Sequence, residues 1–117
     1  MNPYLDIDKN PRVSLIVKDL KSLPLDAFID TGFTGGIAIP IKLKHYFQVK
    51  PGLIQRFILA DGSVMPVQLF EFMVNYKNNN KLVSGFFISG KDALVGIEFL
   101  KGFKFILDFK KFIISLD

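Results

Sequence analysis

Apolar residues alternate with polar or charged ones through most of this chain, and this period of two is the feature that most restricts its fold. The alternation is clear near the C-terminus, where one set of positions holds Phe103, Phe105, Leu107 and Phe109. Side chains of a strand point in turn to opposite faces of the sheet, so the pattern directs one set toward a core. We therefore expect an all-β protein with these four residues in its core.

Turn signals separate the alternating segments into paired strands. One hairpin joins residues 12–18 to 25–30 through the polar turn "DLKSLP", and another joins 56–60 to 64–76 through Asp61 and Gly62. Asp-Gly is a strong hairpin signal because glycine tolerates positive φ. Helical character is convincing only in Ile41 to Phe47, which follows the short strand "GIAIP". The turn "KNNNK", the segment "LVSGFFIS" and a terminal pair, "FKFILDF" and "KFIISL", complete the expected strands.

Length and composition restrict the classes of protein. The 117 residues, half of them apolar, suit one domain over residues 1–117 that buries roughly two-thirds of its unfolded surface. Without cysteine there is neither a disulfide framework nor a thiolate metal site. The one histidine, His45, belongs to no cluster with metal-ligand spacing, and "GFTGG" lacks the Lys-Ser/Thr of a phosphate loop. We expect no metal and no cofactor.

The distribution of charge bears on partners and location. The net charge of +4 comes from scattered lysines, with Lys110 and Lys111 the only adjacent basic pair, which favours a solvated basic surface over a nucleic-acid site. A nucleic-acid binder is kept as a third alternative, whose affinity would fall steeply with salt. The N-terminus lacks the layout of a secretion signal, and no apolar run reaches the roughly 18 residues that span a bilayer. We expect a cytoplasmic protein without nucleic-acid or membrane partners.

One stretch, "AFIDTGFTGGIAIP", brings a carboxylate, Asp30, to the end of an apolar strand and follows it with Gly32, Gly35 and Gly36. A partial copy occurs 66 positions later, because "DAFIDTG" and "DALVGIE" both open with Asp-Ala and two large apolar residues. The second copy has Gly96 where the first has Asp30. The two segments predict similar strand-and-turn units with approximate two-fold symmetry, of which only one keeps an acid.

The segment "IDTGFTG" resembles the Asp-Thr-Gly signature of aspartic proteases. "ALVGIEFL" resembles the element of two hydrophobic residues and a glycine that follows the flap in small, single-domain retropepsin-like proteases. The hairpin "FILADGSVMPVQLFEF" lies between these two segments, at the place of that family's flap. The order and spacing agree from about Val13 to Leu116, and Phe-Thr-Gly after the signature looks most like the prokaryotic single-domain branch.

The resemblance implies a retropepsin-like acid protease fold, a small closed β-barrel with a flap hairpin and one or two short helices. It implies a catalytic Asp30 on a scaffold of Thr31 and Gly32. The implied flap tip consists of Ala60, Asp61, Gly62 and Ser63. The implied substrate groove is lined by Phe33, Thr34, Leu59, Val95 and Gly96, together with Phe57.

The implied chemistry needs two carboxyls, one acting as base toward a water and one protonating the amide nitrogen. Since Gly96 occupies the place of a second acid, the resemblance implies an isologous homodimer in which each chain supplies one Asp30. The function implied is a homodimeric aspartic endopeptidase that takes peptide or protein substrates.

Two alternatives remain beside this interpretation. Asp followed by Thr-Gly is also an ordinary turn, in which the acid bonds the backbone two residues on. A retropepsin-like dimer that has lost turnover could instead bind peptides or proteins as a regulatory module. Many retropepsins have a small residue, an acid and an arginine where this chain has Phe33, Thr34 and Ile97, which predicts a different way of bracing the site. Glu98 replaces the usual Asn or Asp, and Gly96 is read either as part of this element or as a tight turn before a short helix, "IEFL".

Overall fold

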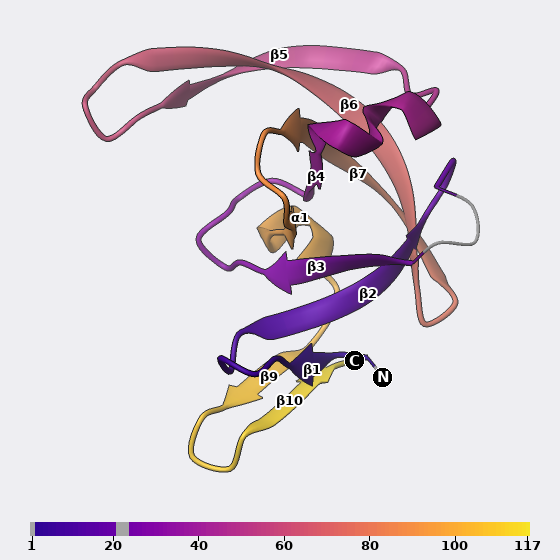
Figure 1. The fold of residues 1–117 in the computed structure, drawn as a ribbon, viewed down its shortest axis with the longest axis vertical. Coiled ribbons are helices and arrows are strands. Elements are labelled where there is room, and N and C mark those ends of the chain that lie inside the picture. Colours follow the sequence, from indigo (N-terminus) through magenta and orange to yellow (C-terminus); the bar gives the residue numbers. More distant parts are fainter. Residues whose placement is uncertain (1, 21–23) are drawn as a thin grey trace.

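The computed structural model describes residues 2–20 and 24–117, and strands make up most of it (Figure 1). The N-terminal half contains β1 (Tyr4–Leu5), β2 (Pro11–Val17), β3 (Leu25–Ile29), β4 (Ile37–Pro40) and β5 (Pro51–Ile58). The C-terminal half contains β6 (Val64–Tyr76), β7 (Asn79–Ile88), β8 (Ala93–Val95), β9 (Phe105–Asp108) and β10 (Ile113–Leu116). The helices are the 3-10 helix η1 (Ile41–Tyr46) and the short α1 (Ile97–Leu100). None of the helices in the described residues is long and apolar enough to cross a membrane.

The main sheet closes on itself. Its strands follow the order β1-β2-β3-β8-β4-β7-β6-β5, and an additional pairing of β2 with β6 joins the two sides into a ring. Strands β9 and β10 form a separate two-stranded sheet. The expected all-β class, the closed arrangement of strands and the two short helices are therefore confirmed.

The core fills the inside of this ring. Inward positions of the alternating strands supply it, among them Val13, Leu15, Ala27, Ile37, Val74 and Val95, each at most 1% exposed. The C-terminal strand is tied to this core, because the buried hydroxyl of Tyr76 donates a hydrogen bond of 2.7 Å to the carbonyl oxygen of Leu116. Burial of apolar side chains contributes roughly 25 cal/mol per Å², so these positions dominate the stability of the fold.

The two segments that resemble each other in sequence lie side by side. Strands β3 and β8 pair in parallel, with Ala27 opposite Ala93, Phe28 opposite Leu94 and Ile29 opposite Val95. Corresponding positions of the two copies are thus neighbours across the ladder. The repeat therefore has a structural meaning, since the second copy lies next to the strand that ends at Asp30.

Several strand predictions are confirmed with shifted boundaries. The pairs β2/β3, β5/β6 and β9/β10 are antiparallel as expected, but β5 begins at Pro51 and ends at Ile58 instead of spanning 56–60. The turn predicted at "KNNNK" narrows to Lys77 and Asn78, whose positive φ angles of 46° and 65° suit a tight two-residue hairpin. Residues 21–23 of the turn "DLKSLP" lie outside the described residues.

The prediction that Phe109 belongs to the core is wrong, since its side chain is 57% exposed. The reason is local: β9 ends at Asp108, whose carboxylate accepts hydrogen bonds from the backbone N–H groups of Lys110 and Lys111 at 2.8 and 3.0 Å. The chain therefore turns at 109–112, and the alternation of the strand stops before Phe109. Phe103, Phe105 and Leu107 are each partly buried.

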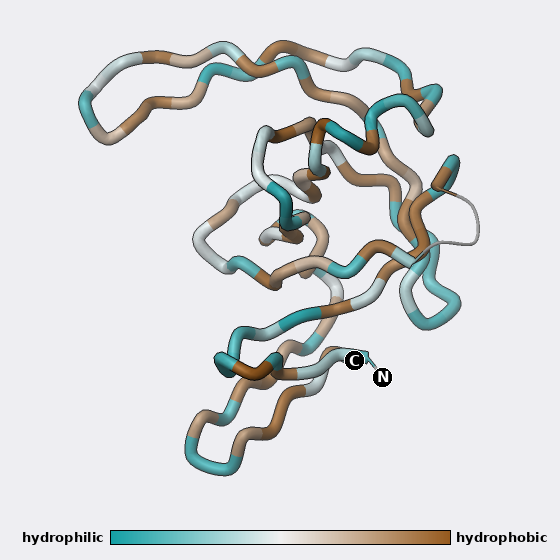
Figure 2. Tube along the Cα trace, viewed as in Figure 1, coloured by the Kyte–Doolittle hydropathy of each residue, from teal (hydrophilic) through white to brown (hydrophobic). Residues whose placement is uncertain are grey.

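Two hairpins project from opposite ends of the molecule (Figure 1). The β5/β6 hairpin extends well beyond the ring at one end, and β9/β10 extends at the other, beside β1 and both termini. Apolar segments continue along both hairpins although they leave the core (Figure 2). Exposed apolar residues on β9/β10 and its turn are Ile106, Phe109, Phe112 and Ile113.

Arg12 on β2 forms ion pairs with three carboxylates from separate parts of the chain. Its guanidinium lies 2.9 Å from the carboxylate of Asp6, 3.3 Å from that of Asp26 and 3.8 Å from that of Asp92. It also lies over the ring of Phe28, 3.8 Å from the centroid. Asp26 and Asp92 are the opening acids of the two similar segments, so one cation compensates both copies. The hydrogen bond from Arg12 is the main cause that lowers the pKa of Asp6.

We expect Arg12→Gln to lower the melting temperature at neutral pH by about 5 °C, because three carboxylates lose their shared cation. The lowered pKa of Asp6 means that its contribution to stability is present above the unfolded value of about 3.9 and is lost as the pH falls through the folded value. The variant should lose less stability than the wild type on acidification from about pH 5 to pH 2. Thermal and urea unfolding across this range measure both effects.

Arg56→Gln is the matched control, because Arg56 is exposed on β5 and none of the ion pairs among the described residues includes it. Its stability should match the wild type at every pH. Equal acid sensitivity of the wild type and Arg12→Gln would contradict the role given to Arg12.

Candidate active site

Asp30 is the first residue after β3, on the outward side of that strand. Leu25, Ala27 and Ile29 are buried, whereas the intervening Phe28 and then Asp30 are only partly buried. The backbone N–H of Asp30 donates a hydrogen bond of 2.9 Å to the carbonyl oxygen of Val95 on β8. The position of the carboxylate is thus set by the strand from the second sequence copy.

The residues Asp30, Thr31 and Gly32 form a tight turn. The Oδ1 atom of Asp30 accepts a hydrogen bond from the backbone N–H of Gly32 at 2.9 Å, and the carbonyl oxygen of Asp30 accepts one from Phe33 at 3.1 Å. Thr31 and Gly32 are exposed. This geometry is that of an ordinary Asx turn, and it fixes one carboxylate oxygen while the other has no hydrogen bond to the described residues.

The loop that follows the turn, residues 33–36, is hydrogen-bonded to the start of α1. The backbone N–H groups of Gly96, Ile97 and Glu98 donate to the carbonyl oxygens of Gly36, Phe33 and Gly35, at 3.0, 2.8 and 3.1 Å respectively. A Cβ atom on residue 96 would lie 2.3 Å from the oxygen of Phe33 and 2.5 Å from that of Gly35. Only glycine at position 96 therefore permits this contact, and the short helix expected at "IEFL" is confirmed as α1.

Val95 and Gly96, which the sequence places in the groove, are both buried. Val95 is 0% exposed and supports Asp30 through its carbonyl oxygen. Gly96 lies under the backbone of the 33–36 loop. In this structure both residues contribute by holding the loop in place.

The hairpin β5/β6 is the segment for which the sequence predicts a flap; that role stays a prediction, and we call this hairpin the flap. Its tip is an exposed turn in which Leu59 and Ser63 are joined by a backbone hydrogen bond of 2.8 Å and Gly62 has a φ of +85°. The carboxylate of Asp61 accepts hydrogen bonds from the hydroxyl and the backbone N–H of Ser63, which lower the pKa of Asp61. Ala60 is exposed with the rest of the tip, and Leu59 is 44% exposed.

Two hollows flank the loop that carries Asp30. The first has a volume of about 400 Å³ and is lined by Asn10, Pro11, Phe28, Ile29, Asp30, Thr31 and Leu94. The second, of about 190 Å³, lies between the loop and the base of the flap and is lined by Thr34, Gly35, Gln55, Phe57, Leu69, Ser84, Gly85, Phe86 and Glu98. The Asp30 carboxylate thus borders an open depression, with a smaller pocket nearby on the flap side.

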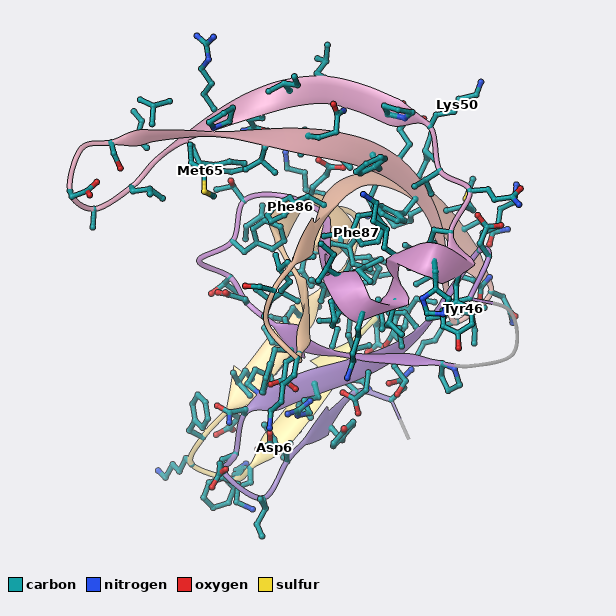
Figure 3. The ribbon with its side chains drawn as sticks, turned by 45° about the horizontal axis from the view of Figure 1, so that its top comes forward. Asp6, Tyr46, Lys50, Met65, Phe86 and Phe87 are labelled. Carbon is teal, nitrogen blue, oxygen red and sulfur yellow. The ribbon has the colours of Figure 1, made fainter. Side chains whose placement is uncertain are left out.

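Aromatic contacts connect the loop to the flap. Phe33 packs edge-on against Phe86 of β7 with ring centroids 5.6 Å apart, and Phe57 of the flap lies 5.7 Å from the same ring. Figure 3 shows Met65 on the hairpin above Phe86, whose ring lies beneath the flap. Phe33 and Phe57 therefore lie at the boundary between the loop and the flap.

Several residues of these hollows were missed by the sequence analysis. Phe28 and Leu94 occupy equivalent positions of the two similar segments, and their outward phase in the alternation was a usable signal. Gln55, Ser84 and Glu98 come from three separate elements, and no local pattern connects them. His45 is exposed on η1, and no group of three or more His, Cys, Asp or Glu in the described residues is placed to hold a metal.

Comparisons with known proteins agree with this geometry. No protein-family model matches the sequence, and no curated protein matches it. Among solved structures, a retropepsin-like aspartic protease from Rickettsia conorii is 20% identical with a TM-score of 0.64, covering 91% of this chain and 82% of that one. The protease of EIAV, solved with the inhibitor HBY-793, is 13% identical with a TM-score of 0.54, covering 78% of this chain and 85% of that one.

These likenesses extend over most of each chain. At 13% and 20% identity, such likenesses show the fold alone. This protein has the fold of the retropepsin-like aspartic proteases.

Proposed function

We propose that this protein is a homodimeric aspartic endopeptidase in which the two Asp30 carboxyls, one from each chain, activate a water molecule. The observation that carries the proposal is the placement of Asp30 on a fixed loop beside an open depression, with a flap hairpin facing the same loop. The retropepsin-like fold supports this assignment, because the two solved structures named above are described as proteases.

The chemistry follows from the repulsion between two like charges. Two carboxylates about 4 Å apart repel by roughly 4 kcal/mol at an effective dielectric constant of 20, which corresponds to about three pKa units. Such a pair holds one proton over a range of pH, as is known for the dyads of aspartic proteases. The ionised member takes a proton from water, and the protonated member gives its proton to the amide nitrogen.

The two carboxylate oxygens of Asp30 differ in their hydrogen bonds, and this difference suits the proposed role. Oδ1 is held by the N–H of Gly32, so the carboxylate cannot rotate freely, while the other oxygen is available for a water or for the partner's acid. The walls of the adjoining depression, Phe28 and Leu94, are apolar and partly exposed. Together with Phe33, Phe57 and Leu59 they favour apolar side chains next to the scissile bond.

The surface of the chain supports association with a second copy. Thr31, beside Asp30, is exposed, and the C-terminal hairpin carries Ile106, Phe109, Phe112 and Ile113 at 41%, 57%, 55% and 50% exposure. Several exposed apolar side chains on one short hairpin are typical of interaction sites. A two-fold dimer would place the same patch of each chain against the other.

We expect Asp30→Asn to reduce peptide hydrolysis by roughly 10²–10⁴-fold or more, because asparagine cannot act as a general base or acid at this position. The measurement is cleavage of an unfolded protein and of peptide libraries from about pH 4 to pH 7, followed by mass spectrometry. Circular dichroism and thermal unfolding serve as controls for the fold. Equal cleavage by the wild type and the variant would reject the enzymatic assignment, and peptide binding without cleavage by the wild type would support the binding module instead.

A mixing experiment tests whether each active site uses two chains. Wild-type and Asp30→Asn chains are denatured together and refolded at equal concentrations, so that about half of the wild-type chains pair with a variant chain. Activity per wild-type chain should fall by about half, and it should fall further in proportion to excess variant. Glu71→Gln is the control partner, since Glu71 is exposed on β6 outside the site, and it should leave activity per total chain unchanged. A constant activity per wild-type chain in mixtures with Asp30→Asn would show that one chain suffices.

A further inference from the structure

The pocket of about 190 Å³ between the Asp30 loop and the base of the flap contains a carboxylate that the proposed reaction does not use. Glu98, the second residue of α1, lines this pocket and is partly buried. Its Oε1 atom accepts a hydrogen bond of 2.6 Å from the backbone N–H of Ser84 on β7. The side chain is therefore held in one place, with its negative charge at the pocket wall.

The remaining wall of the pocket combines aromatic rings with neutral hydrogen-bonding groups. Phe57 and Phe86 contribute rings with centroids 5.7 Å apart, and Thr34, Gln55 and Ser84 contribute a hydroxyl, an amide and a second hydroxyl. The volume is that of roughly six water molecules at about 30 Å³ each, enough for one long side chain. Aromatic faces and a carboxylate both attract cations. The rings and Glu98 therefore both favour a positively charged ligand.

The described residues place no basic side chain in the lining of this pocket. None of the ion pairs in residues 2–20 and 24–117 involves Glu98. Lys81 is the basic residue whose charge acts on Glu98, but its ammonium donates hydrogen bonds to the carbonyl oxygens of Phe99, at 2.6 Å, and of Lys101. Lys81 is thus held by α1 and the residue after it, and it does not fill the pocket.

We propose that Glu98 makes this pocket a subsite for a lysine or arginine side chain of the peptide substrate. The inference rests on the proposed function, because the pocket adjoins the Asp30 loop and the flap, between which the peptide would lie. The cationic head would meet the carboxylate of Glu98, with its aliphatic stem along the rings of Phe57 and Phe86. The substrate class is then a peptide with apolar residues at the scissile bond and a basic residue at one fixed distance from it.

The test compares the wild type with Glu98→Gln on peptide libraries in which each position carries Lys, Arg, Gln, norleucine or Glu. Glutamine keeps an oxygen for the N–H of Ser84, so the substitution removes the charge and leaves the supporting hydrogen bond in place. The wild type should prefer Lys or Arg over Gln by roughly 10-fold at one position relative to the cleaved bond. In Glu98→Gln this ratio should fall to about 1.

Glu71→Gln is the matched control, since it removes one carboxylate from an exposed site outside the pocket and should keep the preference. If Glu98→Gln fails to fold, Gln55→Lys provides the second variant. Its added ammonium would lie at the pocket wall on the exposed strand β5, and it should abolish the preference for a basic residue. Cleavage by the wild type without any basic preference, or retention of that preference by these variants, would overturn the proposal.

A binding arm separates this inference from the proposed function. The Asp30→Asn protein is titrated with fluorescein-labelled peptides that differ only in Lys or norleucine at the scanned position, and anisotropy gives the dissociation constants. Tighter binding of the Lys peptide, lost in Asp30→Asn combined with Glu98→Gln, supports the subsite even if the wild type cleaves nothing. Equal affinity for the two peptides, or no binding of either at the highest concentration, overturns it.

Discussion

The candidate site depends on one close backbone contact, the seating of the 33–36 loop on the start of α1. Three N–H groups at positions 96–98 satisfy three carbonyl oxygens of the loop, and this arrangement leaves no room for a side chain on residue 96. Buried backbone groups without partners are costly, so these hydrogen bonds fix the loop as firmly as strand pairing would. Val95, directly before these three residues, accepts a hydrogen bond from the backbone N–H of Asp30. The β8–α1 segment therefore holds the backbone both at Asp30 and in the loop that follows it.

An ion-pair cluster links the two similar segments through Arg12, and none of the ion pairs among the described residues lies in the Asp30 loop. The acid and arginine found near the site in many retropepsins are both replaced here, by Thr34 and Ile97. Arg12 instead compensates Asp26 and Asp92, the opening acids of the two similar segments, and its guanidinium covers the ring of Phe28. Since Phe28 is also a wall of the depression at Asp30, the same cation supports a surface that the substrate would contact.

The sequence alone predicts the strands, turns and site residues that a local pattern of residues marks. Alternation and turn chemistry locate β2, β3, β9, β10 and the flap turn, and the Asp-Thr-Gly segment locates Asp30. Phe109 was misplaced because the Asp108 carboxylate ends the strand by capping the next turn, a side-chain effect that competes with periodicity. The walls of the smaller pocket could not be predicted, because Thr34, Gln55 and Glu98 come from separate elements that meet only in the folded chain. Arg12 was missed for the same reason, since its three acids belong to separate segments.

Gly96 also bears on why one chain would not suffice for the proposed reaction. It occupies the position equivalent to Asp30 in the second sequence copy, so an aspartate there is the direct route to a pair of acids within one chain. The Cβ atom of any such residue would lie within 2.5 Å of two carbonyl oxygens of the 33–36 loop. Contacts below 3.0 Å force the backbone to move, and the backbone that would move is the loop that positions Asp30. The second segment can therefore support the first acid or carry an acid of its own, but in this fold it cannot do both. A second carboxyl has to approach Asp30 from the exposed side of the loop, where Thr31 and Gly32 face outward.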